Sequence, residues 1–274
     1  MKTILLSGPA GAGKTALAEY SARQQGAELI YYLCHEWSVA EDFLFEISIP
    51  AVAKTMAGIE TPSSFYKEGV LARALRLSQS RRVVLLLDEI DKASSRIDAL
   101  LLDFLQNARL PLPEGGFLFG NPDNLQVWIT SNGQREIIDP LARRLFKLEL
   151  GFLPAEVEAQ LLAGTPSEFY LDGVRRFILR YMEYEPVIYE APTLQKFVAK
   201  VGAYIRSKGL DISLFELKQL YLNLPVCENR EEVELLVKGW LCRNEEYELA
   251  LKERFVGLAN LANALLDLYR REAK

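Results

Sequence analysis

The feature that most constrains the fold of this chain is a glycine-rich stretch between a short apolar run and a helix-forming segment. Residues 3–7 read as a buried strand, and residues 8–15 match the pattern G-x-x-x-x-G-K-[ST]. In such a loop the glycines let the backbone curl, so that successive N–H groups point at phosphate oxygens. A helix predicted over residues 13–25 and stopped by Gly26 presents the positive end of its dipole to the same anion. The stretch therefore predicts a phosphate-binding loop.

Two side chains of this loop carry chemistry. Lys14 is predicted to reach the β- and γ-phosphates of a nucleoside triphosphate, and Thr15 is predicted to give its hydroxyl group to Mg²⁺. A glycine turn in front of a helix is the alternative interpretation, but the preceding strand favours the phosphate site. The predicted nucleotide-binding residues of the loop are Gly8, Pro9, Ala10, Gly11, Ala12, Gly13, Lys14, Thr15 and Ala16.

A pair of acidic residues follows a second apolar run. Asp88 and Glu89 come directly after residues 83–87, which are aliphatic throughout. In a parallel sheet the carboxyl ends of the strands form the ligand-binding edge, so this pair should lie beside the phosphate loop. Asp88 is predicted to hold the nucleotide's Mg²⁺, directly or through water, and Glu89 to orient and deprotonate an attacking water. A solvated acidic turn is the alternative, which the phosphate loop makes less favourable.

The first half of the chain has the pattern of an α/β domain. Further apolar runs at residues 29–33 and 125–129 predict strands that are buried on both faces, as in a parallel sheet. Helices are predicted over residues 69–78 and 95–107, which fits crossover connections between parallel strands. The turn-rich residues 110–117 predict a projecting loop or hairpin.

The second half lacks strand signals. Apolar residues at helical spacing recur through it, and residues 165–168 form a capping box that predicts a helix start. We therefore predict two domains. An α/β nucleotide-binding domain with a parallel sheet flanked by helices should span residues 1–152, and a smaller all-α lid with further helices should span residues 153–274.

Composition limits the classes of function. The net charge is −5, which argues against an extended nucleic-acid surface, because such a surface needs a basic footprint. Three separated cysteines and a single histidine disfavour a disulfide framework or a zinc cluster. The aliphatic run at residues 83–87 is too short to span a membrane, and the start of the chain lacks a signal-peptide core. These features predict a soluble, cytoplasmic protein.

Several stretches together resemble the AAA+ ATPases, and more narrowly the MoxR-like and dynein-related branch. Besides the two motifs above, the similarity covers residues 67–75, 99–105, 127–132 and 139–144, and it extends over residues 1–155. The resemblance implies ATP and Mg²⁺ as cofactors. It also implies a homo-oligomeric ring, by analogy a hexamer, and a protein client such as a von Willebrand factor A-type protein.

The resemblance assigns two further roles near the site. Asn132, at the end of a strand, is similar to the sensor residue that bonds the attacking water or the γ-phosphate, although Ser-Asn-Gly is also a common turn. Arg144, with Arg143 as the fallback, is similar to an arginine finger that acts on the neighbouring subunit's nucleotide. The lid departs from the family pattern. Its expected sensor arginine is missing at residues 191–194, which leaves weak substitutes at Arg175, Arg176 and Arg180.

Other functions remain open from the sequence. A P-loop small-molecule kinase would use the same loop, and a nucleotide-switched binding protein would need little turnover. GTP could replace ATP, although no Asn-Lys-x-Asp guanine motif is present. A DNA-acting motor is disfavoured by the charge balance. An aromatic segment between residues 31 and 45 could face a client, but packing is the simpler interpretation.

Overall fold

The structure is a computed structural model that describes residues 1–59, 65–153, 155–162 and 171–273. The chain divides into two compact units, residues 1–144 and 145–274, whose boundary falls slightly before the one expected near residue 152. The capping box predicted at residues 165–168 lies outside the described residues. Within the described part of the chain, no helix is both long and apolar enough to cross a membrane.

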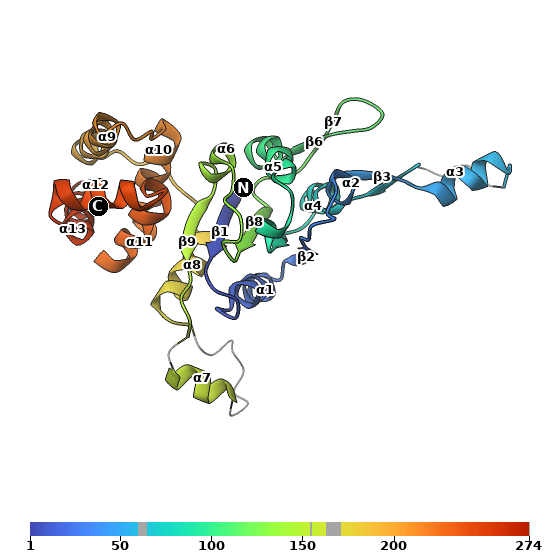
Figure 1. The fold of residues 1–274 in the computed structure, drawn as a ribbon. Coiled ribbons are helices and arrows are strands. Elements are labelled where there is room, and N and C mark those ends of the chain that lie inside the picture. Colours follow the sequence, from blue (N-terminus) through green and yellow to red (C-terminus); the bar gives the residue numbers. More distant parts are fainter. Residues whose placement is uncertain (60–64, 154, 163–170, 274) are drawn as a thin grey trace. The chain divides into compact units, whose positions relative to one another are not determined.

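The central sheet has five strands in the order β2-β5-β8-β1-β9 (Figure 1). β2 pairs with β5, β5 with β8, and β8 with β1, and all three pairs are parallel. The predicted parallel α/β architecture is therefore confirmed. The strands are β1 (Lys2–Ser7), β2 (Glu28–Leu33), β5 (Val83–Asp88), β8 (Leu125–Ser131) and β9 (Phe146–Glu149).

Crossover helices cover the strands of the first unit. α1 (Lys14–Gln24) and α4 (Val70–Ser78) both pack against β5, while α5 (Ser95–Asn107) packs against α6 (Asp139–Ala142). Every residue of β5 is buried. Burial of the whole strand explains why it is aliphatic throughout rather than alternating between apolar and polar residues.

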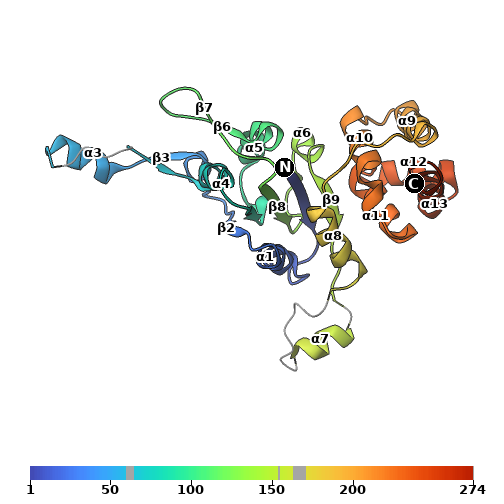
Figure 2. The same ribbon diagram turned by 180° about the vertical axis from the view of Figure 1, so that it is seen from behind.

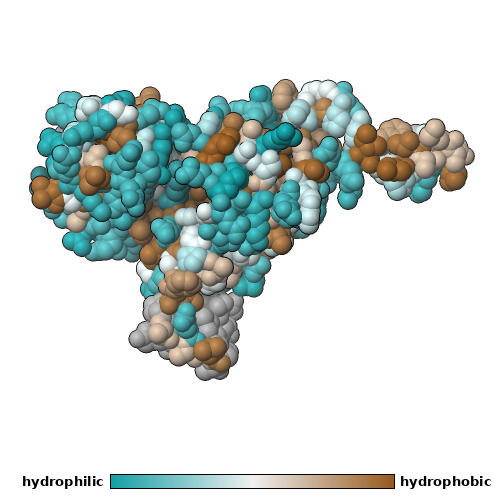
Figure 3. Space-filling view, viewed as in Figure 1, coloured by the Kyte–Doolittle hydropathy of each residue, from teal (hydrophilic) through white to brown (hydrophobic). Residues whose placement is uncertain are grey.

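Two antiparallel strand pairs are inserted in the connections between sheet strands, one between β2 and β5 and the other between β5 and β8. β3 (Phe45–Ile47) pairs with β4 (Tyr66–Glu68), and β6 (Arg109–Pro111) pairs with β7 (Phe117–Phe119), where the turn-rich residues predicted a hairpin. Between β3 and β4 lies α3 (Ile49–Met56), at the far end of that hairpin (Figure 2). α3 has no buried residue, and Figure 3 shows apolar side chains on it. The exposed apolar residues of this insert include Ile47, Ile49, Met56 and Ile59.

The aromatic segment is only partly packed. Phe43, in the short α2 (Ala40–Phe43), is fully buried and lies against Tyr32, with their ring centroids 4.8 Å apart. Trp37, in contrast, is 77% exposed. Packing therefore explains part of the segment but leaves the loop tryptophan in solvent.

The regular structure described in the second unit consists of β9 and helices, and the helices lie in the part of the chain predicted to be all-α. α11 packs against α10, α13 and β9. Its core includes a cluster of aromatic rings around Phe146, which stacks on Tyr181 at 4.0 Å between centroids and contacts Trp240 at 5.6 Å. Its helices are α7 (Ala155–Leu162), α8 (Gly173–Glu183), α9 (Pro192–Ser207), α10 (Leu214–Asn223), α11 (Arg230–Leu241), α12 (Glu245–Phe255) and α13 (Leu258–Glu272).

Gly239 makes this aromatic cluster possible, because a Cβ atom there would lie 2.0 Å from the ring of Phe146. We predict that Gly239→Ala lowers the free energy of unfolding by about 1–3 kcal/mol through overpacking. Replacing glycine by alanine inside a helix normally stabilises by about 1 kcal/mol, so the expected sign is reversed. Urea unfolding should test this against Gly173→Ala, whose Cβ would meet no atom within 4 Å. Equal stabilities of the two variants would contradict it.

Candidate functional site

The glycine-rich loop joins the end of β1 to the start of α1. Gly8, Gly11 and Gly13 adopt φ angles of 135°, 83° and 81°, which side-chain-bearing residues rarely adopt. The side chain of Lys14 folds back over this loop, and its Nζ donates to the carbonyl oxygens of Gly8 and Pro9, both at 2.8 Å. Desolvation lowers the pKa of Lys14, and nearby carboxylates oppose that shift.

Asp88, at the end of β5, is in direct contact with the loop. The hydroxyl of Thr15 donates to its two carboxylate oxygens at 3.0 and 3.1 Å. Thr130 of β8 also donates to Asp88, and the Thr130 hydroxyl accepts the backbone N–H of Glu89 at 2.8 Å. One buried hydroxyl thus ties the two acidic residues to the neighbouring strand. The sequence pattern did not single out Thr130.

Asn132, which follows β8, bridges the lysine and the second acid. Its Oδ1 accepts from Lys14 Nζ at 2.8 Å, and its Nδ2 donates to Glu89 Oε1 at 2.9 Å. Glu89 also pairs with Lys92, with 2.5 Å between Nζ and Oε2. The structure therefore brings Lys14, Thr15, Asp88, Glu89 and Asn132 together in one hydrogen-bonded group.

Asp91 stabilises the turn at Asn132 by accepting hydrogen bonds from its backbone. It lies in the 3₁₀ turn η1 (Ile90–Lys92), is 5% exposed, and accepts the backbone N–H groups of Asn132 at 3.1 Å and Gln134 at 2.9 Å through Oδ2. Its other oxygen, Oδ1, is buried and has no hydrogen-bond partner among the residues that the structure describes. The turn signal at Asn132-Gly133 could have pointed to such an acceptor, because turn N–H groups need one.

A buried ion pair secures the next part of the same segment. The guanidinium of Arg135 binds both oxygens of Asp98 at 2.7 and 2.8 Å, and Asp98 is 0% exposed. Arg135 also donates to the carbonyl oxygens of Ile90 and Ala93, each at 3.0 Å. The segment after Asn132 is therefore fixed to both η1 and α5.

Of the two candidate finger residues, Arg144 and Arg143, the first makes its described contacts outside the hydrogen-bonded group around Lys14. Arg144 donates to the carbonyl oxygen of Pro140 at 2.6 Å and to Gln106 Oε1 at 2.8 Å. Arg143 is half-buried and also has an interaction partner. Among the described contacts, none joins Arg144 to the group around Lys14.

The three arginines considered as substitutes for the lid's sensor arginine form ion pairs or hydrogen bonds with residues of the second unit. Arg175 pairs with Asp172, Arg176 donates to the carbonyl oxygen of Leu171 at 2.7 Å, and Arg180 pairs with Glu232 at 2.5 Å. These pairings give each guanidinium a structural partner. Their part in a nucleotide site stays a prediction.

The donor set around Asp88 fits a magnesium ion. Mg²⁺ prefers oxygen ligands and is usually held by one or two carboxylates together with substrate phosphates. Thr15 and Asp88 supply a hydroxyl and a carboxylate in mutual contact. Within the described residues there is no cluster of three or more histidine, cysteine or acidic side chains suited to a metal. A hydroxyl and a carboxylate in contact are a partial set of oxygen ligands, which substrate phosphates would complete.

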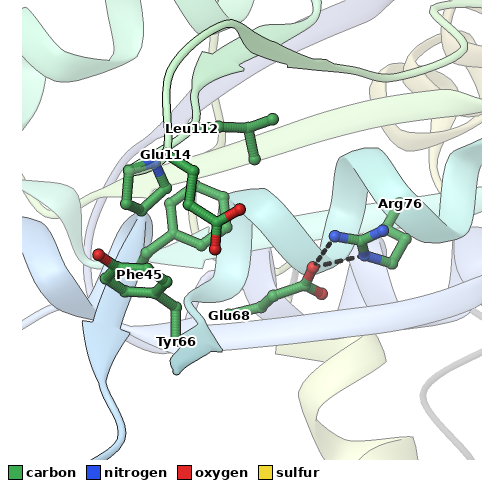
Figure 4. Close-up of a pocket in the computed structure, with 7 residues that line it drawn as sticks. Phe45, Tyr66, Glu68, Arg76, Leu112 and Glu114 are labelled. Carbon is green, nitrogen blue, oxygen red and sulfur yellow. Dashed lines mark hydrogen bonds and ion pairs between the residues drawn. The ribbon is translucent and has the colours of Figure 1, made fainter. Parts of the chain in front are cut away.

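A separate pocket of about 520 Å³ lies between the two hairpins (Figure 4). Aromatic and aliphatic side chains form much of its wall, and Glu68 forms an ion pair with Arg76 across its edge. No predicted site residue lines it. Its lining residues are Phe45, Tyr66, Glu68, Arg76, Leu112, Pro113 and Glu114.

The chain is similar to known proteins in sequence and in fold. The sequence profile of the family described as AAA domain (dynein-related subfamily) matches residues 3–146. ATPase family gene 2 protein homolog B from Bos taurus is 26% identical over 175 residues, which are 60% of this chain and 18% of that protein. The chain thus spans less than a fifth of that relative. A solved structure of a candidate ATPase from Cytophaga hutchinsonii aligns with a TM-score of 0.61 at 13% identity. The alignment covers 96% of this chain and 84% of the chain in that structure, and at this identity the similarity shows the fold alone.

Arg135 gives a prediction about stability at the site. Removing one partner of a buried ion pair leaves an uncompensated charge, so Arg135→Ala should lower the free energy of unfolding by about 3 kcal/mol. Arg81→Ala is the matched control, because the Arg81–Glu28 pair is exposed, with side-chain exposures of 58% and 45%. Its loss should cost about 0–1 kcal/mol. Urea unfolding of both variants measures the difference, and equal effects would contradict the assignment.

Proposed function

Because the chain belongs to the AAA domain family, in its dynein-related subfamily, we propose that it hydrolyses ATP with Mg²⁺ at residues 8–15 and their partners. The observation that carries this proposal is the group in which Asn132 links Lys14 to Glu89 while Thr15 contacts Asp88. These side chains come from the carboxyl ends of β5 and β8 and from the start of α1, and they have the chemistry that phosphoryl transfer to water requires.

Each residue has a role in this proposal. The N–H groups of the loop and the Lys14 ammonium hold the phosphates, and the Thr15 hydroxyl and Asp88 carboxylate hold Mg²⁺. The bound Mg²⁺ supplies neutralisation of phosphate charge. Glu89 orients the attacking water and accepts its proton, and Asn132 fixes the Glu89 carboxylate through the 2.9 Å bond to Oε1. Asp91 positions Asn132 by holding the backbone of its turn.

The site also needs a cation for the transition-state charge, and we assign Arg144 of a neighbouring copy to this role. Within its own chain the Arg144 guanidinium bonds only a backbone carbonyl and the side chain of Gln106 among the contacts described. A self-assembled ring would bring this arginine to the next subunit's nucleotide. By family resemblance we propose a hexamer, acting on a protein client such as a von Willebrand factor A-type protein.

Two variants separate binding from turnover. Lys14→Ala should abolish ATP binding, because it removes the cation of the loop. Glu89→Gln should keep ATP binding but slow hydrolysis by about 10²–10⁴-fold, the usual contribution of a general base. Calorimetric titration and phosphate release measure the two quantities, with Lys67→Ala as control, since that side chain is 76% exposed and pairs with Glu46, which is also exposed. Unchanged ATP affinity in Lys14→Ala would refute the loop assignment. Unchanged turnover in Glu89→Gln would refute the base.

A mixing experiment tests the shared site. Arg144→Ala should leave ATP binding intact and slow hydrolysis by about 10³-fold, as loss of an arginine finger does. Lys14→Ala subunits lack a working site but keep Arg144, so adding them to Arg144→Ala subunits should restore part of the activity. Arg143→Ala tests the fallback assignment: activity retained in that variant favours Arg144 as the finger, and activity lost there but rescued by Lys14→Ala subunits would move the role to Arg143. Failure of rescue in confirmed mixed assemblies would argue against a finger acting between subunits.

A further inference from the structure

The carboxylate of Asp88 has more hydroxyl donors than the loop motif requires. Its two oxygens offer about four acceptor positions. Oδ1 accepts from Thr15 and Thr130, and Oδ2 accepts from Thr15 at 3.1 Å and from the phenol of Tyr31 at 3.2 Å. Three hydroxyl protons therefore share the carboxylate, and the Thr15 proton is divided between its two oxygens.

The three donors differ in how firmly they are held. Thr130 is 0% exposed and also accepts the N–H of Glu89, so it is fixed within the sheet. Thr15 is itself the proposed second oxygen ligand of the metal. Tyr31, on the edge strand β2, is 46% exposed. Of the three donors, Tyr31 is the one whose side chain can leave Asp88 at least cost in packing.

The two neighbouring tyrosines of β2 direct their hydroxyl groups to different partners. Tyr31 donates its O–H to the Asp88 carboxylate. Its neighbour Tyr32 points to different partners, because successive side chains of a strand alternate in direction. The Tyr32 hydroxyl bonds Ser38 at 3.0 Å and Asp42 at 2.9 Å.

We propose that Tyr31 is a positioning residue of the metal site whose hydroxyl competes with Mg²⁺ for the Oδ2 atom of Asp88. This inference rests on the proposed function. Mg²⁺ binding at this carboxylate requires lone pairs that the hydroxyl groups now occupy, and the Tyr31 bond is the exposed one. Tyr31 thereby raises the Mg²⁺ concentration at which the site fills. Because Tyr31 lies on β2, its release from Asp88 would couple Mg²⁺ binding to that edge strand.

Tyr31→Phe removes the hydroxyl and keeps the ring. The Mg²⁺ concentration that half-saturates metal-dependent ADP binding should fall about two- to tenfold, the range that one net hydrogen bond supplies. Calorimetric titration of ADP at a series of free Mg²⁺ concentrations measures this without turnover. The Mg²⁺ dependence of ATP hydrolysis should shift in the same direction. Affinity for ADP with Mg²⁺ removed by EDTA should not change.

Tyr32→Phe is the matched control, since it removes one hydroxyl from the same strand but not from Asp88. It should leave the Mg²⁺ dependence unchanged. An unchanged or increased Mg²⁺ requirement in Tyr31→Phe, with the variant's unfolding midpoint preserved, would overturn the competition. Wild-type protein that binds no nucleotide with Mg²⁺ would instead overturn the proposed function, so the two failures are distinguishable.

Discussion

The parallel register of β1, β5 and β8 is the constraint on which the site depends. Ser7 lies opposite Ser131, and Leu87 opposite Ile129, so the three strands end at the same level. The residues that follow them, the glycine loop, Asp88-Glu89 and Asn132, then meet although Lys14 and Asn132 are 118 positions apart. Because these strands are buried on both faces, a shift along the strand axis would carry apolar residues out of the core at one end and polar residues into it at the other. The same burial that stabilises the sheet therefore aligns the polar residues at its edge.

Negative charge accumulates at this edge, and each carboxylate is stabilised in a different way. Asp98 has a bidentate arginine, Asp91 has two backbone N–H groups, and Asp88 has hydroxyl groups. Only the first is neutralised by a full positive charge. Hydrogen bonds satisfy Asp88 without cancelling its charge, so it retains the attraction for a cation that a paired aspartate would lose. The choice of partner thus separates a structural aspartate from one suited to metal binding.

The sequence predicted the parts of this arrangement that are local. The loop, Asp88, Glu89 and Asn132 each follow directly from a strand end, and a strand end can be recognised from apolar residues and turn signals. Thr130, Asp91 and the Arg135–Asp98 pair were missed because their partners lie 37 to 43 positions away. No spacing rule marks such a contact, since it exists only once the sheet has formed. Tyr31 was noticed as an aromatic residue, but its hydroxyl gained meaning only from the β2–β5 pairing, which places β2 beside Asp88.

The backbone at Glu89 shows what the site requires of the fold. Glu89 has φ 55° and ψ 48°, a left-handed conformation that costs a residue with a side chain about 1–3 kcal/mol. Two bonds hold it there, from its N–H to Thr130 at 2.8 Å and from the Lys92 N–H to its carbonyl at 3.0 Å. The turn stops the strand directly after Asp88, and the Glu89 side chain meets Asn132. An extended residue would continue the strand and send its side chain to one face of the sheet. The strained backbone at Glu89 is therefore what places the Glu89 carboxylate at the edge of the sheet beside the phosphate loop.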